Sequence, residues 1–179
     1  MARFGMAIDT TRCVGCMDCV VACKIENGVP DGYCRDWITE EVHGLFPDLQ
    51  MEIRSERCNH CDRPPCVTCC PTGASHVEDF GSLVLVSSDL CIGCKACLAS
   101  CPYGARFIHP EGYADKCTFC SHRVKDGKDP ACVAVCPTHC MHFGDLDDPE
   151  SEVSRLLASR KNHALLPEAG TGPRIFYLT

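Results

Sequence analysis

Short runs of alternating apolar and polar residues predict several strands along the chain. Large apolar side chains recur at every second position in residues 4–8 and again in residues 49–53. This period of two is typical of half-buried strands. Residues 75–78 and 83–86 flank a turn at residues 79–82 and predict a hairpin. The strands are short and lie far apart along the chain.

The helices that the pattern predicts are also short. Helical turns are expected over residues 19–23 and 97–101, and a longer helix is expected from Asp148 to about Arg160. Asp148 would be its N-cap and Pro149 would occupy its first turn. A loop then leads to a final strand at residues 175–178. These mixed elements predict an α+β fold.

Nineteen of the 179 residues are cysteines, a proportion otherwise found in small disulfide scaffolds. Three features argue against disulfides: the count is odd, the chain is long for a stapled miniprotein, and no signal peptide is expected before the first cysteine motif at Cys13. Few large apolar side chains remain to build a core. The thiols are therefore interpreted as ligands of inorganic centres that the chain folds around.

The cysteines form four motifs that repeat in alternation. The tight spacing C-x2-C-x2-C-x3-C occurs at residues 13–23 and again at residues 91–101. A looser spacing follows each: C-x2-C-x4-C-x3-C at residues 58–70, and C-x2-C-x11-C-x3-C at residues 117–136. Internal repetition of this kind predicts repeated binding units.

The tight motif is the ligand run of bacterial ferredoxins, which bind [4Fe–4S] clusters. Three closely spaced cysteines wrap one cluster, and the fourth, on the following helix, ligates the other cluster of a pair. Proline follows Cys70, Cys101 and Cys136, whereas Lys24 follows Cys23. Zinc is the competing interpretation of C-x-x-C pairs, but a tetrahedral zinc site gains nothing from a third C-x2-C step.

Nested pairing of the motifs predicts four clusters and their sixteen ligands. The first and last motifs give one set made of Cys13, Cys16, Cys19 and Cys136, and another made of Cys117, Cys120, Cys132 and Cys23. The central motifs give Cys58, Cys61, Cys66 and Cys101, and Cys91, Cys94, Cys97 and Cys70. The remaining cysteines, Cys34, Cys69 and Cys140, are interpreted as small buried apolar residues.

Several polar residues beside the motifs could tune the clusters. His60 and His122 could donate hydrogen bonds, although ordinary packing is the alternative. Lys24, Lys95 and Lys116 adjoin predicted ligands and could raise a local potential, or could be solvated charges. No nucleophile–base pair, phosphate-binding loop or open metal position is apparent, so no catalytic residue is predicted and the chain is expected to transfer electrons without substrate chemistry of its own.

Charge and hydropathy restrict the partners. The formal charge is −7, and about −2 for each of four clusters would bring it to about −15. Such a charge disfavours nucleic acid and anionic membrane surfaces as partners. No apolar run approaches the length of a membrane span, so no direct membrane insertion is expected.

The loose motifs and the second tight motif resemble those of a known family. Residues 58–74, residues 91–106 and residues 116–120 look like the signature of four-cluster electron-transfer (B) subunits of the DMSO reductase molybdoenzyme superfamily. The resemblance extends from residue 1 to about 148, and residues 143–150 look most like those of polysulfide/thiosulfate reductase B subunits. Arsenate and tetrathionate reductase subunits look similar too.

The resemblance implies two ferredoxin-like units, each holding two [4Fe–4S] clusters. Residues 54–112 would form an inner unit, residues 1–53 and 113–148 a discontinuous outer unit, and residues 149–179 a C-terminal tail that either wraps the surface or docks a partner. The implied partners are a molybdopterin catalytic subunit and an NrfD-like or similar quinone-reactive membrane subunit. The complex would be peripheral to the membrane, on the periplasmic face by co-export with a signal-bearing partner, or on the cytoplasmic face.

Two other functions stay open at this point. One is the iron–sulfur subunit of a cytoplasmic hydrogenase or formate-oxidising complex. The other is a diffusible ferredoxin carrier, which four clusters and a cysteine-free tail make less suitable. Neither the substrate of a partner enzyme nor the direction of electron flow follows from these residues.

Overall fold

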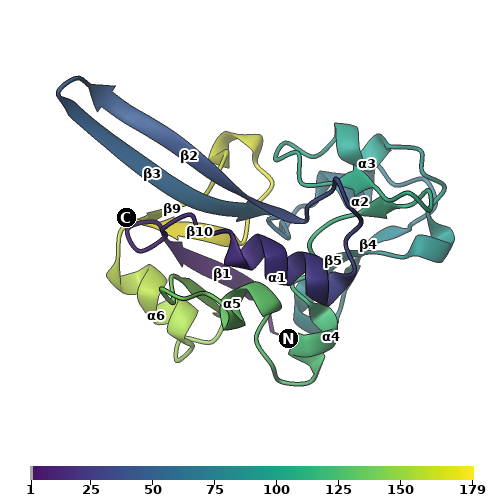
Figure 1. Cartoon of the computed structure of the whole chain (residues 1–179). Helices are drawn as coiled ribbons and strands as arrows, with labels where there is room; N and C mark the ends of the chain where they lie inside the picture. Colours follow the sequence, from purple (N-terminus) through teal and green to yellow (C-terminus); the bar gives the residue numbers. More distant parts are fainter. Residues whose placement is uncertain (1) are drawn as a thin grey trace.

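Short helices and strands, joined by long loops, make up the structure, a computed structural model that describes residues 2–179 (Figure 1). The strands are β1 (Phe4–Asp9), β2 (Asp36–Leu45), β3 (Asp48–Arg57), β4 (Ser75–Glu78), β5 (Leu83–Val86), β6 (Phe107–Ile108), β7 (Ala114–Asp115), β8 (Met141–Asp145), β9 (Asn162–His163) and β10 (Ile175–Leu178). The α-helices are α1 (Asp18–Asn27), α2 (Pro65–Thr68), α3 (Ala96–Ala99), α4 (Ser121–Lys125), α5 (Ala131–Ala134) and α6 (Glu152–Ser159). Three short 3₁₀ helices are η1 (Phe80–Ser82), η2 (Ser88–Leu90) and η3 (Pro167–Ala169).

The largest sheet joins the two ends of the chain. Its strand order is β8-β1-β10-β9, with β1 parallel to β10 and antiparallel to β8. Met6, Ile8, Ile175 and Tyr177 of this sheet are fully or almost fully buried. Residues 149–179, for which the sequence predicts a tail, therefore supply a central strand of the sheet. A docking role for this segment stays a prediction.

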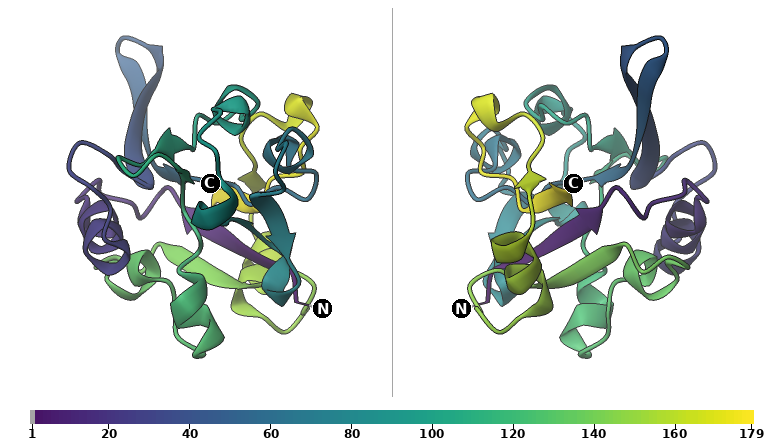
Figure 2. Two further views of the ribbon diagram at one scale, coloured as in Figure 1. Left: turned by 90° about the vertical axis from the view of Figure 1, so that its right-hand side faces the viewer. Right: turned by 90° about the vertical axis from the view of Figure 1, so that its left-hand side faces the viewer.

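A long hairpin projects from the body of the molecule. β2 and β3 pair antiparallel along their full length, from Asp36 opposite Arg57 to Leu45 opposite Asp48. Figures 1 and 2 show this hairpin extending well beyond the other elements. Its tip exposes Leu45 (85 %) and Phe46 (89 %). The predicted unit boundary between residues 53 and 54 falls within β3.

The helical turn predicted over residues 19–23 lies within α1, whereas the one predicted over residues 97–101 is wrong at its end, because α3 stops at Ala99 and leaves Cys101 outside the helix. The hairpin of β4 and β5 and the last strand, β10, have the predicted bounds. The predicted N-cap of the C-terminal helix is wrong. The helix α6 begins at Glu152, because the Ser151 side chain accepts a hydrogen bond from the Ser154 backbone N–H and so caps it. Asp148 instead accepts a hydrogen bond from the Glu150 N–H in the preceding turn.

Helices from different motifs pack in pairs. α1, in the first motif, packs against α5, in the last, and α2 packs against α3 of the two central motifs. Each of the four helices carries the third cysteine of its motif, and all four of these cysteines are buried: Cys19, Cys132, Cys66 and Cys97. The nested relation of the four motifs in the sequence is thus repeated in their helices.

Candidate iron–sulfur centres

The two tight motifs share one backbone conformation, which the repeat in sequence explains. Gly15 and Met17 have φ values of 66° and 64°, and Gly93 and Lys95 have 64° and 63°. A left-handed residue at these two positions curls the loop around its cysteines and turns backbone N–H groups toward a common centre. A side chain at Gly93 is also excluded by space, because its Cβ would lie 2.5 Å from the Gly112 carbonyl oxygen.

Three cavities are each lined by four of the predicted ligands. The Cys13 group (Cys13, Cys16, Cys19 and Cys136) lines the first. The Cys58 group (Cys58, Cys61, Cys66 and Cys101) lines the second, and the Cys91 group (Cys91, Cys94, Cys97 and Cys70) lines the third. Each cavity thus draws three cysteines from one motif and the fourth from the partner motif.

The fourth set, the Cys117 group (Cys117, Cys120, Cys132 and Cys23), is buried throughout. The Asn27 side-chain amide lies 3.7 Å from the sulfurs of both Cys23 and Cys120. Burial, together with the charges of Asp36, Cys117 and Cys132, raises the pKa of Cys23 far above the ordinary thiol value. The linings of the three cavities and the neighbours of Cys23 thus agree with the four predicted sets, and the role of these cysteines as cluster ligands stays a prediction.

The thiols in these sets suit a cationic metal centre. Burial raises the pKa of Cys117 to about 12 and that of Cys132 to about 11. Buried thiols of this kind stay protonated near neutral pH, and a bound metal displaces the proton. All nineteen cysteines are free thiols in the structure. A donor set of four sulfurs around a common space fits a [4Fe–4S] cluster.

A fully buried arginine, which the sequence did not indicate, lies between two of the sets. Arg57 donates from Nη1 to the Cys132 sulfur at 2.8 Å and from Nη2 to Ser55 Oγ. Ser55 Oγ in turn lies 3.5 Å from the Cys19 sulfur. Asp36 Oδ2 lies 3.8 Å from Nη1, and burial raises the pKa of this carboxyl although Arg57 opposes the rise.

Arg106 occupies the corresponding place between the other two sets. Its Nη2 lies 2.9 Å from both the Cys66 sulfur and Ser75 Oγ, and its side chain lines the cavities of both the Cys58 and Cys91 groups. Within residues 2–179 its buried Nη1 has no hydrogen-bond partner. A donor left unpaired at the wall of both cavities fits an acceptor, such as a cluster sulfide, on their inside.

Lys116 and His60 are buried where the Cys58 and Cys117 groups approach each other. Lys116 Nζ donates to the backbone carbonyls of Val84 and Cys117, the latter at 2.7 Å. His60 Nδ1 accepts from the Val84 N–H, so Nε2 carries the proton and donates to the Cys117 carbonyl at 3.1 Å. Desolvation and the Lys116 charge lower the pKa of His60 far below its ordinary value, so the ring is neutral.

The other residues singled out in the sequence lie away from the sulfurs or in solvent. His122 is exposed and pairs with Glu26 at 2.8 Å. Lys24 donates to the carbonyls of Pro30 and Tyr33 and so fastens a loop. Lys95 is exposed. The interpretation of the three remaining cysteines as buried apolar residues is wrong for Cys34, which is exposed, and holds for Cys140. Cys69 is half-buried, and its sulfur lies 3.3 Å from Ser100 Oγ.

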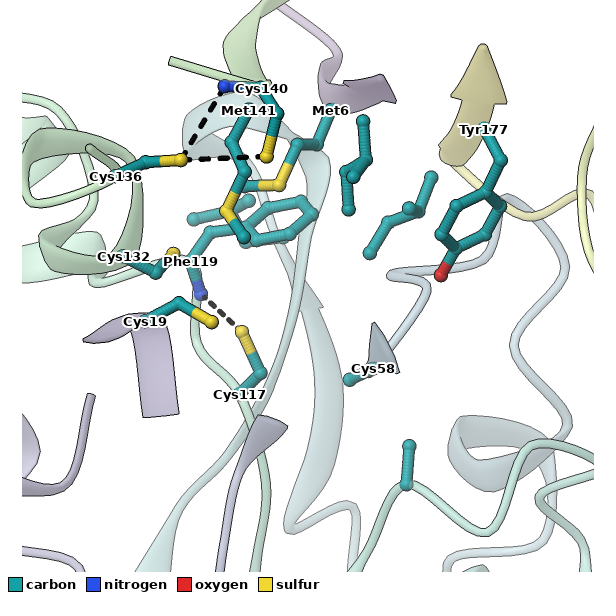
Figure 3. Packing of buried hydrophobic residues seen from close by; sticks show 14 residues of the cluster. Met6, Cys19, Cys58, Cys117, Phe119, Cys132, Cys136, Cys140, Met141 and Tyr177 are labelled. Carbon is teal, nitrogen blue, oxygen red and sulfur yellow. Dashed lines mark hydrogen bonds between the residues drawn. The ribbon is translucent and has the colours of Figure 1, made fainter. Parts of the chain in front are cut away.

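Cys140 is a fifth thiol in the cavity of the Cys13 group. It is almost fully buried, and its sulfur lies 3.4 Å from that of Cys136, toward which its backbone N–H also points (Figure 3). A hydrogen bond from the Cys140 thiol is the main cause that lowers the pKa of Cys13 to about 6. No pattern in the sequence indicated this contact, because Cys140 stands outside every motif.

Comparison with known proteins identifies relatives across almost the whole length of the molecule. Residues 49–146 match the 4Fe-4S dicluster domain, and residues 10–31 match a 4Fe-4S binding domain. Protein NrfC of Escherichia coli K12 is 45 % identical over 97 % of this chain and 79 % of its own length. The polysulfide reductase B subunit of Wolinella succinogenes is 41 % identical, over 97 % of this chain and 93 % of its own length.

The arsenate respiratory reductase iron-sulfur subunit ArrB of Shewanella sp. ANA-3 is 39 % identical over 98 % of this chain and 96 % of its own length. Among residues 2–179 no helix has the length and apolar character needed to cross a bilayer.

Proposed function

The chain belongs to the 4Fe-4S dicluster family of iron–sulfur electron-transfer subunits, and we propose that it carries single electrons through four [4Fe–4S] clusters between a molybdopterin catalytic subunit and a quinone-linked membrane subunit. The observation that carries this proposal is the gathering of sixteen cysteines into four sets, each made of three thiols from one motif and one from its partner.

In this proposal the ligands are the sixteen cysteines of the Cys13, Cys117, Cys58 and Cys91 groups. The bound clusters would supply one-electron redox centres. The chain's own residues would hold them in place, and they bury the thiols of the Cys117 group and place buried donors beside the sulfurs. Two ferredoxin-like units, each with two clusters, are supported by the packing of α1 on α5 and of α2 on α3.

Contacts through buried side chains suggest the order of the clusters. Arg57 and Ser55 link the Cys13 and Cys117 groups, Lys116 and His60 lie between the Cys117 and Cys58 groups, and Arg106 lies between the Cys58 and Cys91 groups. The order along the path is then the Cys13, Cys117, Cys58 and Cys91 groups.

Exposure supports electron transfer to and from partners at the two ends of this path. Cys16 of the Cys13 group and Cys94 of the Cys91 group are exposed, whereas the Cys117 group is wholly buried. Val14 beside Cys16 and Ile92 beside Cys94 are exposed apolar residues. Apolar surface next to a terminal cluster suits the docking of a partner that receives or delivers electrons.

Purification of the native complex from membranes under anaerobic conditions tests the proposal. We expect molybdenum, a membrane-embedded partner, and about sixteen iron and sixteen sulfide per copy of this chain. Nickel in place of molybdenum would indicate a hydrogenase, and a free monomer would indicate a diffusible carrier. Zinc, or cystine bridges, would overturn the assignment of the sixteen cysteines.

The side of the membrane needs a separate experiment. We propose the periplasmic face, on the strength of the resemblance to subunits exported with a catalytic partner. Protease added to intact spheroplasts is then expected to degrade the chain. Protection in spheroplasts, with degradation only after lysis, would place the complex on the cytoplasmic face.

A further inference from the structure

We propose that three buried cations, Arg57, Lys116 and Arg106, alternate with the four cluster sites. Each one would raise the reduction potential of the two clusters on either side of it through its positive charge. The inference rests on the proposed function, because it presupposes four clusters. None of the three belongs to the sixteen predicted ligands, and each lies in a different gap between neighbouring groups.

Arg106 gives the clearest case. The residue is 8 % exposed, its guanidinium donates to the Cys66 sulfur, and its side chain lines the cavities of both the Cys58 and Cys91 groups. Within residues 2–179 its guanidinium contacts the Cys66 sulfur and Ser75 Oγ and forms no ion pair with a carboxylate. Once clusters are bound, the thiolate sulfurs of the two groups are the anions that it faces.

Arg57 repeats this arrangement in the other half of the site. Arg57 contacts Cys132 and Arg106 contacts Cys66, and each of these cysteines is the third ligand candidate of a loose motif. Each guanidinium also donates to a buried serine, Ser55 or Ser75. The two arginines thus make the same pair of contacts at sites related by the internal repeat. This recurrence indicates a role connected with the clusters.

Lys116 fills the central gap. Its side chain is 1 % exposed and its ammonium donates to the Cys117 carbonyl and to Val84. The neutral His60 ring, stacked on Phe119 at 3.9 Å between ring centroids, closes the space beside it. Burial of a lysine without a carboxylate partner is unfavourable unless nearby anions compensate it. Once clusters are bound, the thiolates of the Cys58 and Cys117 groups are such anions.

The effect follows from charge in a medium of low polarity. Each cluster with its four thiolates carries about −2, and reduction adds one negative charge. Where water is excluded, charges interact more strongly than in solvent. A cation between two clusters favours the reduced form of both and weakens the repulsion between two reduced neighbours. Electrons can then occupy adjacent clusters along the path.

The test compares redox titrations, followed by EPR, of the complex with wild-type chain and with Arg106→Gln. We expect two of the four potentials to fall, so that at a fixed potential the reduced-to-oxidised ratio of those two clusters drops at least tenfold, or about 59 mV. The other two ratios are expected to stay within twofold. Arg106→Lys, which keeps the charge, is expected to restore both ratios to within threefold.

Lys95→Gln is the matched control. Lys95 lies between Cys94 and Cys97 and lines the same cavity as Arg106, but it is exposed to solvent. Its removal is expected to change each ratio less than threefold. Lys116→Gln provides the second arm, since it is expected to lower a different pair of potentials that shares one cluster with the pair affected by Arg106→Gln.

Several outcomes would overturn the inference. They are unchanged potentials in Arg106→Gln, an equal shift of all four clusters, or a Lys95→Gln effect as large as that of Arg106→Gln. Iron loss in both glutamine variants would also overturn it, because the cations would then be needed to hold the clusters rather than to set their potentials. Fewer than four clusters in the wild-type chain would instead refute the proposed function.

Discussion

The first and last motifs form the Cys13 and Cys117 groups, the outer half of the site, and the central motifs form the Cys58 and Cys91 groups, the inner half. The two halves surround their arginines with different charges. Arg57 faces the buried carboxylate of Asp36 at 3.8 Å, whereas Arg106 has no acidic partner within the described residues. The outer groups also have a fifth thiol, Cys140, close to Cys136. One repeated scaffold thus holds two sets of sites with different local charge.

The helices differ as well. α1 has ten residues and leads into the long β2–β3 hairpin, whereas α3 has four and is followed by a loop. Asp36 and Arg57 are the first and last residues of that hairpin and pair across its base. The insertion that distinguishes the outer groups therefore also brings the carboxylate to its arginine. Cluster sites built on the same motif thus acquire different local charges through the segments inserted between the motifs.

The largest effect is expected when a fourth cysteine is removed, because in each half it should ligate the cluster of the partner motif. Cys23→Ala is expected to remove one cluster, about four iron per chain. Adding Cys117→Ala should remove no more, whereas adding Cys13→Ala should remove about four more. Iron and acid-labile sulfide per chain are the measurement. Cys101→Ala, combined with Cys58→Ala or with Cys91→Ala, is the equivalent test in the inner half.

The opposite pattern would contradict the exchange. If Cys23→Ala with Cys13→Ala removes a single cluster, each motif ligates its own cluster and the nested assignment is wrong for the outer half. If only one half shows the exchange, the two halves do not bind their clusters in the same way.

The second prediction concerns the carboxylate that only the outer half possesses. Asp36→Asn removes a buried negative charge and should raise the potentials of the two outer clusters. A unit charge at about 8 Å and an effective dielectric constant of about 20 contributes about 2 kcal/mol, more than a tenfold change in the reduced fraction. Redox titration followed by EPR measures it. Equal shifts in the inner clusters would show that Asp36 does not distinguish the two halves.

A smaller effect is expected at the fifth thiol. Cys140→Ala should leave iron content unchanged and lower the reduction potential of one outer cluster, because a hydrogen-bond donor beside Cys136 is lost. The free energy of reduction of that cluster should become less favourable by about 1 kcal/mol, the value of one hydrogen bond. Cys69→Ala is the matched control, since its sulfur contacts Ser100 Oγ. Loss of about four iron in Cys140→Ala would instead make Cys140 a ligand.

The smallest prediction asks whether the C-terminal segment stabilises the outer half. Arg160 pairs with the buried Asp9, which precedes the first motif, and Arg160→Met should lower the free energy of unfolding by about 1 kcal/mol. Burial opposes the shift, but hydrogen bonds from Arg160 and Thr11 lower the pKa of Asp9. The stabilisation is therefore present above the unfolded pKa and is lost as pH falls through the folded one.

Denaturant unfolding of the wild-type chain and Arg160→Met at several pH values measures this contribution. The two curves should converge at acidic pH. A constant difference at every pH would mean that Arg160 acts through packing rather than through the Asp9 carboxylate.

The sequence by itself determined the elements and contacts that lie close together along the chain. It predicted β4, β5 and β10 with their bounds, because strand alternation is a local pattern. The repeated spacing of the cysteines also led to the nested pairing of motifs that lie far apart along the chain, and that assignment of ligands stays a prediction. It also predicted [4Fe–4S] clusters, which the family matches support. The cap of α6 was missed by three residues, because several residues there can cap and only the packed chain selects Ser151.

Only the tertiary structure decided the charges around the sites. Arg57 lies 75 residues from Cys132 and Arg106 lies 40 residues from Cys66, so no local pattern connects either arginine with the sulfur that it contacts. Lys116, adjacent to a ligand in the sequence, could equally have been a solvated charge until its burial was known. Ligands repeat because each cluster needs the same four thiolates. Burial and long-range contacts arise from how separate segments pack, and the spacing of residues along the chain does not record that.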